Sequence, residues 1–476
     1  MKVLSAVSEV YPLVKTGGLG DVTGALPLAL SAHGVEMATL VPGYPAVKAA
    51  LTRAKLVLTF DDLFGGPAKL LRGRAGGLDL FVIEAPHLFD RPGNPYVGPD
   101  GKDWPDNAFR FGALSWVAAR IGLGDVASFV PDIVHCHDWQ AGLAPVYLAH
   151  GNARAASVIT IHNLAYQGKF SSGLLSALRL PPEYYRIDGV EYYGTIGFLK
   201  AGLNFADRIT TVSPNYAKEI QTPENGLGLD GLLRHRSHML SGIVNGIDTK
   251  IWNPQYDRCI ASRFGPKSLA KRAANTAELR YRFGLLAESD RILIGVVSRL
   301  VWQKGLDILA DAAPALLSAG AQMAILGTGD AEIEGRLAVL ASAHPGNVGF
   351  IEGYDEDLAH LIQAGSDVLM VPSRFEPCGV TQLCAMRYGA VPVVAKVGGL
   401  SDTVIDSGDS AVATGFHISP VTRKSVESAF ARVLAVWGNK AQWRQLQQNG
   451  MGTDVSWTKP AERYARLYSD LVATKN

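Results

Sequence analysis

Two cations and a carboxylate stand at the ends of predicted strands in the second half of the 476-residue chain. Arg299 and Lys304 follow a strand predicted over residues 291–298 and precede a helix predicted over residues 305–318. Two positive charges beside a helix N-terminus suit a diphosphate, although surface charges alone would be unremarkable. Glu376 comes after another predicted strand, where it can accept hydrogen bonds from sugar hydroxyls or simply stabilise the dipole of the next helix.

Two glycine-rich loops could bring the backbone close to a ligand. Residues 15–22 follow the first predicted strand, and Gly399 and Leu400 belong to a second loop of this kind. Glycine permits tight turns, and a following helix offers unpaired N–H groups to an anion. The first loop matches neither the P-loop nor the Gly-x-Gly-x-x-Gly pattern, so a plain tight turn stays open as an interpretation. Its candidate ligand-binding residues are Lys15, Gly17, Gly18 and Asp21.

Polar clusters also follow two strands of the first half. The run His135–Trp139 ends a strand predicted over residues 132–136, and His162 and Asn163 follow a strand predicted over residues 157–161. Zinc is not favoured, because neighbouring residues on a strand point to opposite faces and no matching carboxylate or histidine motif is present. One histidine alone is more often structural, but two polar clusters at successive strand ends favour a ligand site.

The elements that position these residues alternate between short β-branched runs and longer helical patterns, which is typical of parallel sheets. In the first half, strands are predicted over residues 2–8, 35–41, 79–84, 132–136, 157–161 and 208–212, and helices over residues 21–33, 108–121 and 140–150. In the second half, strands are predicted over residues 291–298, 322–327, 348–352, 367–372 and 391–395, and helices over residues 305–318, 331–342, 357–365 and 380–388. The predicted fold class is α/β, with two Rossmann-like, doubly wound domains.

A turn-rich segment at residues 244–248 separates the two halves. We predict a first domain over residues 1–243, a second over residues 244–455 and a final helical segment over residues 456–476. Ligands of such sheets bind beyond the carboxyl ends of the strands. We therefore expect the two domains to face each other across a deep cleft that contains the site.

Composition excludes several classes of function. With 45 basic and 44 acidic side chains the formal charge is +1, which gives no electrostatic basis for nucleic-acid binding. The chain is 47% hydrophobic, which excludes general disorder, and it has no apolar run long enough to span a membrane. The first apolar run meets Glu9 too early for a signal peptide. We expect a cytoplasmic protein with neither a nucleic-acid nor a membrane partner.

The four cysteines, Cys136, Cys259, Cys378 and Cys384, form no paired framework. Their spacing fits neither a zinc site nor a redox Cys-x-x-Cys motif, so free thiols are expected.

The candidate groups together suit an activated ligand that joins a diphosphate to a polyhydroxylated group. Tyr354, after the strand that ends near residue 352, could stack on a base. No Asp-x-Asp motif stands at a convincing strand end, which favours charge neutralisation by Arg299 and Lys304 over a divalent cation.

Five segments carry a resemblance to a known family. They are Lys15–Val22, His137–Trp139, Asn245–Asp248, Ser298–Gly305 and Glu376–Gly379. Together they resemble bacterial glycogen synthases and plant starch synthases, over essentially the whole chain. The Lys-Thr-Gly-Gly-Leu loop and the Glu-Pro-Cys-Gly segment are specific to that family, whereas the others occur in many glycosyltransferases of the two-domain GT-B fold.

The resemblance implies a retaining transfer of glucose from ADP-glucose to the non-reducing 4-hydroxyl of an α-1,4-glucan, such as glycogen or a malto-oligosaccharide. It implies no cofactor and no metal requirement. ADP rather than UDP comes from this likeness and not from a readable base contact. It also implies that the final helix, over residues 457–475, returns to the first domain.

The resemblance further implies roles for individual residues. Lys15, Arg299 and Lys304 would hold the diphosphate, and Tyr354 would lie against the adenine. The groups implied to surround the transferred glucose or to line the cleft are Asp138, His162, Asn163, Asn245, Glu376, Cys378 and Gly379.

One position departs from the pattern of many retaining enzymes of this fold. They carry a second glutamate eight residues after the first, which anchors the ribose, and here that position is Cys384. The sequence does not identify another ribose ligand. A nucleotide-sugar epimerase on the same fold and a catalytically inactive glucan-binding protein remain alternatives, and glycogen phosphorylase is disfavoured because no pyridoxal-phosphate lysine motif is found.

Overall fold

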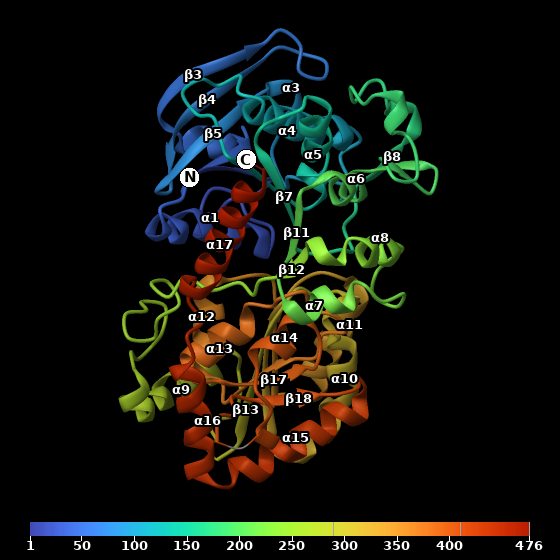
Figure 1. Ribbon diagram of the computed structural model, residues 1–476. Coiled ribbons are helices and arrows are strands. Elements are labelled where there is room, and N and C mark those ends of the chain that lie inside the picture. The colour runs from blue at the N-terminus through green and yellow to red at the C-terminus, as the bar shows by residue number, and fades with distance from the viewer. Residues whose placement is uncertain (289, 410, 476) are drawn as a thin grey trace. The chain divides into compact units, whose positions relative to one another are not determined.

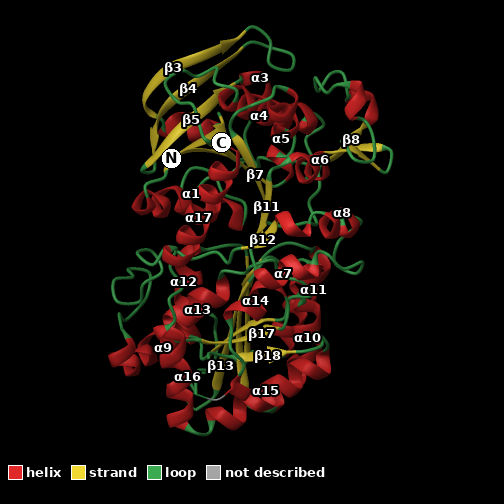
Figure 2. Cartoon of the chain, in the orientation of Figure 1, coloured by secondary structure: helices red, strands yellow, loops and turns green. Residues whose placement is uncertain are grey.

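The computed structural model describes residues 1–288, 290–409 and 411–475 of the chain. Helices and strands alternate through most of these ranges (Figure 2). None of the four cysteines forms a disulfide. Within the described ranges, every helix is too short or too polar to cross a membrane.

The chain forms two compact units (Figure 1). The first consists of Met1–Asn245 together with the chain from Trp457 onward, and the second consists of Gly246–Ser456. The division falls two residues beyond the boundary predicted after residue 243. The final helix, which the resemblance implied returns to the first domain, belongs to the first unit.

The first unit is built on a nine-stranded sheet. From one edge to the other its strands are β12 (Leu240–Gly242), β11 (Arg208–Thr211), β7 (Ala156–Ile161), β6 (Ile133–His137), β1 (Lys2–Ala6), β2 (Glu36–Pro42), β5 (Leu78–Glu84), β4 (Ala68–Ala75) and β3 (Thr52–Phe60). The strands from β12 to β5 are parallel to one another, as predicted. The strands follow the doubly wound pattern. From β1 the chain adds β2 and β5 on one side, and then β6, β7 and β11 on the other.

The hairpin of β3 and β4 was not predicted from the sequence. It adds two antiparallel strands to the edge of an otherwise parallel sheet. The outer strand, β3, is mostly exposed and includes Arg53 and Lys55, so it lacks the apolar alternation that marks a buried strand. Charged residues on an edge strand hinder pairing with other chains, which explains why this segment is not hydrophobic.

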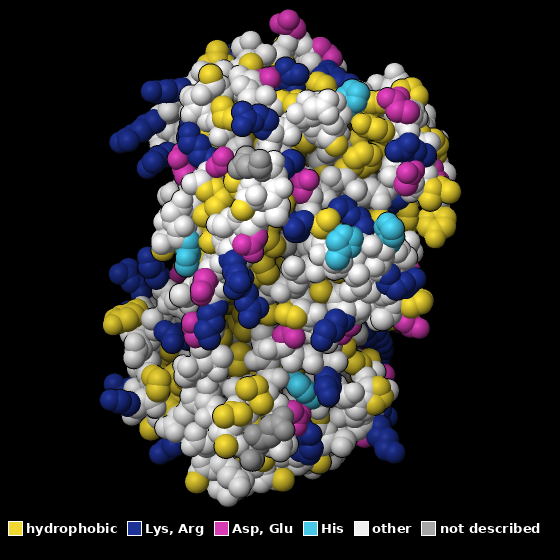
Figure 3. Space-filling model, viewed as in Figure 1, with side chains coloured by type: hydrophobic (Ala, Val, Ile, Leu, Met, Phe, Trp, Pro, Cys, Tyr) yellow, Lys and Arg dark blue, Asp and Glu magenta, His cyan; other side chains and the backbone are white. Residues whose placement is uncertain are grey.

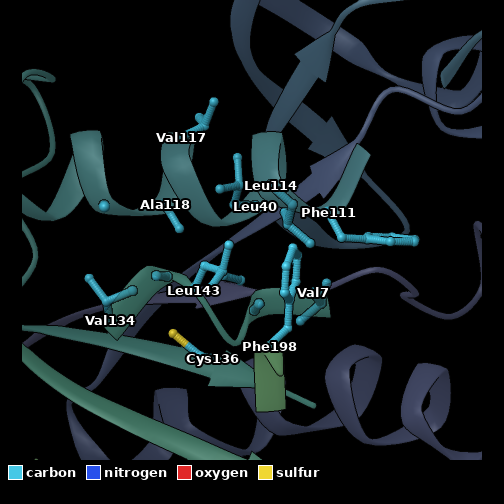
Figure 4. Close-up of a cluster of buried hydrophobic side chains, with 14 of the residues drawn as sticks. Val7, Leu40, Phe111, Leu114, Val117, Ala118, Val134, Cys136, Leu143 and Phe198 are labelled. Carbon is cyan, nitrogen blue, oxygen red and sulfur yellow. The ribbon is translucent and has the colours of Figure 1, made fainter. Parts of the chain in front are cut away.

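One face of the first sheet is covered by α4 (Asn107–Gly122). Phe111, Leu114 and Ala118 of this helix pack with Leu40 of β2 and Val134 of β6 in one buried cluster (Figure 4). Burial of apolar side chains stabilises the folded state by about 25 cal/mol for each Å² of apolar surface removed from water. This cluster therefore holds α4 against the strands that carry the candidate site residues.

A second cluster of the first unit joins sequence-distant helices. Leu26 of α1 (Gly18–Leu30) and Tyr464 of α17 (Thr458–Lys475) pack with Val3 of β1 and Ile133 of β6. Helix α1 begins three residues earlier than the predicted residue 21. The last helix is thus part of the hydrophobic core of the first unit.

The remaining elements of the first unit connect the strands. Its shorter helices are α2 (Pro45–Ala50), α3 (Pro86–Phe89), α5 (Ala144–His150), α6 (Phe198–Phe205), α7 (Pro214–Glu219) and α8 (Asp230–His235). A small antiparallel sheet, also not predicted, has the order β8 (Lys169–Ser171), β10 (Thr195–Gly197) and β9 (Glu191–Tyr192). It lies between β7 and α6 in the chain.

The second unit contains a six-stranded parallel sheet. Its order is β15 (Val348–Glu352), β14 (Ala321–Gly327), β13 (Ile292–Val297), β16 (Val368–Val371), β17 (Val391–Ala395) and β18 (Phe416–Ile418). The first five strands along the chain are those predicted, and β15 and β17 have the predicted bounds. Chain order again reverses at the first strand, so β13 lies between β14 and β16.

Helices cover both faces of the second sheet. They are α9 (Arg272–Arg282), α10 (Leu306–Ser318), α11 (Ala331–Ala343), α12 (Glu356–Gly365), α13 (Thr381–Tyr388), α14 (Gly398–Thr403), α15 (Arg423–Trp437) and α16 (Lys440–Gly452). On β13, Ile292 and Ile294 pack into one buried cluster and Leu293 into another. This alternation shows a strand buried on both sides, as in a doubly wound domain.

Candidate active site

Several predicted site residues follow the strands at which each sheet reverses its order. In doubly wound sheets, ligands bind beyond the carboxyl ends of the strands at this reversal. In the first unit, the glycine-rich loop follows β1 and Asp138 follows β6. In the second unit, Lys304 follows β13 and Glu376 follows β16. Each unit thus brings together side chains that are far apart in the sequence.

The second unit contains what we call the lysine–glutamate cluster, formed by Lys304, Ser373 and Glu376. The Lys304 ammonium lies 2.6 Å from Oε2 of Glu376, and the Ser373 hydroxyl donates to the same oxygen at 2.9 Å. Glu376 is only 7% exposed, whereas Lys304 is half-buried. A buried carboxylate with two donors is held in one orientation before any ligand arrives.

The two loops of this cluster are tied together by hydrogen bonds. Gln303 accepts a bond from the backbone N–H of Arg374 at 2.8 Å through its carbonyl oxygen, and its side-chain amide donates to the Phe375 carbonyl at 3.0 Å. Arg374 in turn forms an ion pair with Asp307 at 2.6 Å. These bonds fix the position of Lys304 relative to Glu376.

Two glycines allow the backbones of this cluster to approach closely. Gly305 has φ +67°, and a Cβ there would lie 2.1 Å from the Pro372 carbonyl oxygen. A Cβ on Gly398, which has φ +42°, would lie 2.0 Å from the carbonyl oxygen of Glu376. Any larger residue would push these loops apart.

The other predicted residues of the second unit lie in the same loops, with one exception. Arg299 is exposed just beyond β13, and no carboxylate within the described ranges forms an ion pair with it. The segment that includes Cys378 and Gly379 packs against α14, because the Gly399 N–H donates to the Glu376 carbonyl at 3.1 Å and Leu400 is fully buried. Tyr354 is exposed after β15, where its hydroxyl donates to Glu356, so the structure does not bring it into the lysine–glutamate cluster.

In the first unit, the glycine-rich loop is organised by a residue that the sequence analysis did not select. Glu9 is buried, and its carboxylate accepts hydrogen bonds from the Thr16 hydroxyl at 2.6 Å and from the Gly17 N–H at 3.2 Å. Tyr96 also donates to this carboxylate, at 2.5 Å. Glu9 lies three residues beyond the end of β1 and directly after the strand predicted over residues 2–8, so the strand-end rule that selected the other residues would have found it.

The cationic residue of this loop also has a partner within the loop. Lys15 forms an ion pair with Asp21 at 2.8 Å, and its ammonium lies 5.6 Å from the ring centre of Tyr11. Nothing lies within 4 Å of a Cβ built on Gly17 or Gly18. The loop surface is therefore open at these two glycines, although the expectation of several unpaired N–H groups there is wrong for Gly17, because Glu9 accepts its hydrogen bond.

Beyond β6 and β7 lies what we call the histidine–aspartate cluster, formed by His135, His137, Asp138 and His162. Asp138 is buried, has φ +54°, and accepts a hydrogen bond from the His162 N–H at 2.7 Å. The Asn163 N–H donates to the same oxygen at 3.4 Å. Burial raises the pKa of Asp138 to about 7, although these two N–H groups oppose the rise.

The histidines of this cluster are linked to one another and are neutral. His137 Nδ1 and His162 Nε2 are 2.9 Å apart, and His137 Nε2 lies 3.2 Å from the Ser5 hydroxyl. Burial lowers the pKa of His162 to about 3. His162 therefore acts as a neutral hydrogen-bonding group at physiological pH and cannot supply a positive charge.

The cluster extends to the last helix of the chain. His135 Nδ1 lies 2.7 Å from the Tyr468 hydroxyl of α17, and His135 Nε2 lies 2.6 Å from the Thr160 hydroxyl. The ring centres of His135 and His137 are 4.1 Å apart. The argument from alternation against a His-x-His pair is therefore wrong, because residues two apart on β6 lie on the same face. In both clusters, the described residues include no group of three side chains arranged to hold a metal ion.

Asn245 ends the first of the two chain segments that form the first unit, and it is buried. Within the described part of the chain, its side-chain oxygen Oδ1 has no hydrogen-bond partner. It is not in contact with either cluster through any hydrogen bond that the structure shows, so its role in ligand binding stays a prediction.

Two protein families match this chain in order along the sequence. The family described as starch synthase catalytic domain matches residues 2–235, and the family described as glycosyl transferases group 1 matches residues 278–450. The first match contains the histidine–aspartate cluster, and the second contains the lysine–glutamate cluster.

Curated relatives match over the whole length. A glycogen synthase of Rhodopseudomonas palustris strain BisA53 is 60% identical, and the alignment covers 100% of this chain and 98% of the relative. A protein named glycogen synthase 2, from Bradyrhizobium diazoefficiens, is 58% identical and is covered to 99%, with 100% of this chain aligned.

Solved structures agree with this assignment. The catalytic domain of starch synthase IV from Arabidopsis thaliana, bound to ADP and acarbose, superposes with a TM-score of 0.88 at 32% identity, and 99% of each chain is covered. A sucrose-phosphate synthase from Thermosynechococcus elongatus has a TM-score of 0.61 at 19% identity, which supports the fold alone. The chain belongs to the glycogen and starch synthase family of GT-B glycosyltransferases, and it is a hexosyltransferase of the glycogen synthase type.

Proposed function

We propose that this enzyme transfers glucose from ADP-glucose to the non-reducing 4-hydroxyl of an α-1,4-glucan, with retention of configuration and release of ADP. ADP as the product is supported by the starch synthase IV relative, whose structure contains ADP and acarbose. The proposed acceptors are glycogen and malto-oligosaccharides, and no metal ion or other cofactor takes part.

The observation that carries this proposal is the lysine–glutamate cluster at the reversal point of the second sheet. Lys304 is held 2.6 Å from Glu376 and would bind a ligand phosphate, and the exposed Arg299 would supply a second cation beyond the same strand. Glu376 and the backbone of Cys378, Gly379, Gly399 and Leu400 would receive the sugar and phosphate groups. Tyr354, which is exposed, would lie against the adenine.

In the first unit, Asp138, His162 and Asn163 would contact the glucose that is transferred. Asp138 and the neutral His162 offer hydrogen-bonding groups in a buried environment, which suits hydroxyls of a sugar better than a second anion. The glycine-rich loop would approach the diphosphate with Gly17, Gly18 and the Lys15–Asp21 pair. Lys15 would then exchange part of its bond to Asp21 for a phosphate oxygen.

The chemistry places its largest demand on the leaving group. Breaking the bond from the sugar C1 to the phosphate oxygen leaves positive charge on the ring and negative charge on ADP. Preorganised cations that meet the negative charge lower the barrier, and removal of one such group costs about 10²–10³ in kcat. No proton has to be delivered, because a diphosphate is already a good leaving group.

Retention requires either a covalent intermediate or attack from the face that the leaving group departs. The buried carboxylates of the two clusters do not favour the first route. Glu376 is occupied by Lys304 and Ser373, and Asp138 has a pKa of about 7, so it is a poor nucleophile when protonated. We therefore favour same-face attack, in which a leaving phosphate oxygen accepts the proton of the acceptor hydroxyl.

A donor comparison tests the proposal. The enzyme is incubated with ADP-glucose or UDP-glucose and glycogen, and release of ADP or UDP is measured, with and without EDTA. We expect ADP release that requires glycogen and survives EDTA. An enzyme that changes a labelled donor without any glucan would be an epimerase, and one that binds glycogen but releases no nucleotide would be a glucan-binding protein.

A further inference from the structure

A cavity of about 730 Å³ opens on the first unit at the outer strands of its large sheet. Its lining includes the segment 125–128 and four basic side chains of β3 and β4, which are Arg53, Lys55, Arg72 and Arg74. We call this cavity the cationic groove. Lys and Arg side chains project over β3 at the upper left of the space-filling view (Figure 3). A cavity of this volume has room for a small organic molecule and not only for an inorganic ion.

The two acidic residues that line the groove are already neutralised by partners. Asp79 accepts hydrogen bonds from Arg72 on both carboxylate oxygens, at 2.7 and 3.2 Å. Asp79 stands opposite Arg74 in the register of β4 and β5, yet its carboxylate is bonded to Arg72. Asp125 forms an ion pair with Arg120, which lies outside the groove. Neither carboxylate is therefore left to neutralise the other cations.

Three positive charges of the groove have no counter-charge from the chain. Arg53, Lys55 and Arg74 are exposed, and within the described ranges no carboxylate forms an ion pair with any of them. Protection of an edge strand would account for charges on β3, but it does not account for Arg74, because β4 is paired on both sides. Cations that line one cavity repel one another until an anion lies between them.

The backbone of β3 is distorted at the groove. Between Thr52 and Lys55 the register shifts, so that three steps along β3 match two steps along β4. Arg53 lies inside this irregularity with φ +54°. Glycine is the residue that adopts a positive φ without strain, and a bulge of this kind changes the direction in which a side chain points. The chain thus keeps a guanidinium at a position where glycine would suit the backbone better.

One wall of the groove is rigid. The Arg72 guanidinium lies 5.1 Å from the ring centre of Phe81 and 5.2 Å from that of Phe129, in addition to its two bonds to Asp79. The exposed Ser128 lines the groove from another part of the chain and offers a hydroxyl. The groove therefore combines a fixed wall, three cations without a counter-charge and a neutral hydrogen-bonding group.

We propose that the cationic groove binds a small phosphorylated molecule of the sugar phosphate class. Guanidinium groups match the geometry of phosphate oxygens, and Lys55 adds a further positive charge. The volume beyond one phosphate group and the Ser128 hydroxyl suit a polyhydroxylated body. An uncharged sugar would leave the three cations without an anion. The site is separate from both clusters and does not depend on the proposed function.

The test is calorimetric titration of the full-length enzyme at low ionic strength. The probes are fructose 1,6-bisphosphate, inorganic phosphate and glucose. We expect the bisphosphate to bind more tightly than phosphate and glucose not to bind. Because exposed charges are screened by salt, the affinity for the bisphosphate should fall as the salt concentration rises.

Two variants remove one charge each from the groove. Arg53→Asn keeps a residue that tolerates positive φ, and Arg74→Gln keeps a long polar side chain on β4. Each should weaken binding of the bisphosphate about 10-fold, as for the loss of one charge-assisted hydrogen bond. Lys69→Gln is the matched control, because Lys69 is an exposed lysine of β4 that does not line the groove. It should bind like the original chain.

Lys304→Ala separates this groove from the lysine–glutamate cluster, and its affinity for the bisphosphate should be unchanged. Loss of binding in Lys304→Ala, with normal binding in Arg53→Asn and Arg74→Gln, would overturn the groove and place the probe at the candidate active site. No binding by the original chain, or an equal loss in Lys69→Gln, would also overturn it. Equal affinity for inorganic phosphate would show that the groove recognises the free anion and would overturn the sugar phosphate class.

Discussion

The lysine–glutamate cluster and the histidine–aspartate cluster occupy equivalent places in their sheets but use opposite electrostatics. Lys304 and Glu376 form a charged pair at 2.6 Å, and Ser373 supplies a second donor to the carboxylate. By contrast, His162 is neutral because burial lowers its pKa to about 3, and the pKa of Asp138 is about 7. The same fold therefore holds an ion pair in the second unit, whereas in the first unit burial favours the uncharged forms of Asp138 and His162.

This difference matches the two ends of the proposed donor. A diphosphate carries negative charge that grows during the reaction, so fixed cations favour the transition state. A glucose unit is neutral and is recognised through hydroxyls, so buried uncharged groups avoid the cost of removing an ion from water. Variants that change one cluster at a time test this difference.

The largest effect is expected for Lys304→Ala. Loss of one preorganised cation should lower kcat by about 10²–10³ in an assay of ADP release from ADP-glucose with glycogen. Lys424→Ala is the matched control, because Lys424 is an exposed lysine of α15 in the same unit. Turnover near that of the original chain in Lys304→Ala would contradict the assignment of this cluster to the diphosphate.

The neutral character of the other cluster is tested by Asp138→Asn. In the unfolded chain the carboxyl titrates near 3.8, whereas in the folded chain its pKa is about 7. Between these two pH values the carboxyl is ionised in the unfolded chain and protonated in the folded chain. The free energy of unfolding therefore falls as the pH rises, and the loss is complete above about pH 7. Asparagine does not titrate, so the variant should gain stability relative to the original chain, by on the order of 4 kcal/mol, between pH 4 and pH 8.

Urea unfolding at pH 4, 6 and 8 measures this gain. Asp207→Asn should show the opposite trend. Burial raises the pKa of Asp207, but hydrogen bonds from Ser157 and Lys475 bring it below its ordinary value, so its contribution to stability is lost as pH falls. A pH-independent difference between Asp138→Asn and the original chain would show that Asp138 is ionised in the fold.

The close approach of the loops around Glu376 is tested by Gly398→Ala. A Cβ at this position would lie 2.0 Å from the Glu376 carbonyl oxygen, at a φ of +42°. We expect a loss of about 1–3 kcal/mol in the free energy of unfolding, together with lower activity, because the carboxylate moves with its backbone.

Gly335→Ala is the matched control for that variant. Gly335 lies within α11, and nothing is within 4 Å of a Cβ built there. Alanine in a helix should therefore stabilise the chain by about 0.5–1 kcal/mol and leave ADP release unchanged. If both variants behave alike, the glycine at position 398 is not needed for the position of Glu376.

A smaller effect is expected for Tyr468→Phe, which removes the hydroxyl 2.7 Å from His135 Nδ1. An unpaired buried polar atom costs about 1–3 kcal/mol. Because His135 packs against His137, and His137 is bonded to His162, we also expect a several-fold fall in kcat with little change in KM. Calorimetry and ADP-release kinetics measure the two effects.

The control for Tyr468→Phe is Tyr147→Phe. The Tyr147 hydroxyl donates to the Leu178 carbonyl at 2.6 Å, also in the buried part of the first unit. This variant should lose similar stability without any change in kcat. An equal fall in kcat for both would show that Tyr468 supports the fold only and does not position the histidines.

Much of the fold could be predicted from the sequence, because strands buried on both faces are marked by continuous apolar runs. This holds for β17, which is buried throughout and has the predicted bounds. The edge strand β15 also has the predicted bounds, although only its first two residues are buried. The pattern fails for β3, whose exposed edge carries no such run, and for the small sheet of β8, β9 and β10, whose strands are only two or three residues long. Short or exposed strands are determined by the elements beside them, which a local pattern does not reveal.

The candidate site could be predicted where its residues directly follow strands. This rule selected Asp138, Lys304 and Glu376, and it would also have selected Glu9. It could not find Tyr468, which reaches His135 across 333 residues of chain. Nor could it show that Asp138 has a raised pKa, since that depends on burial by residues from several elements.

The position of α17 has a consequence for synthesis on the ribosome. Val3, Leu26 and Ile133 emerge early, but the cluster that buries them is completed by Trp457 and Tyr464. Until translation is almost finished, the first unit exposes an apolar surface that chaperones or proteases can recognise. A chain interrupted before Trp457 would keep that surface exposed permanently, so nonsense mutations near the end of the gene should remove the enzyme by degradation, even though both clusters would have been synthesised.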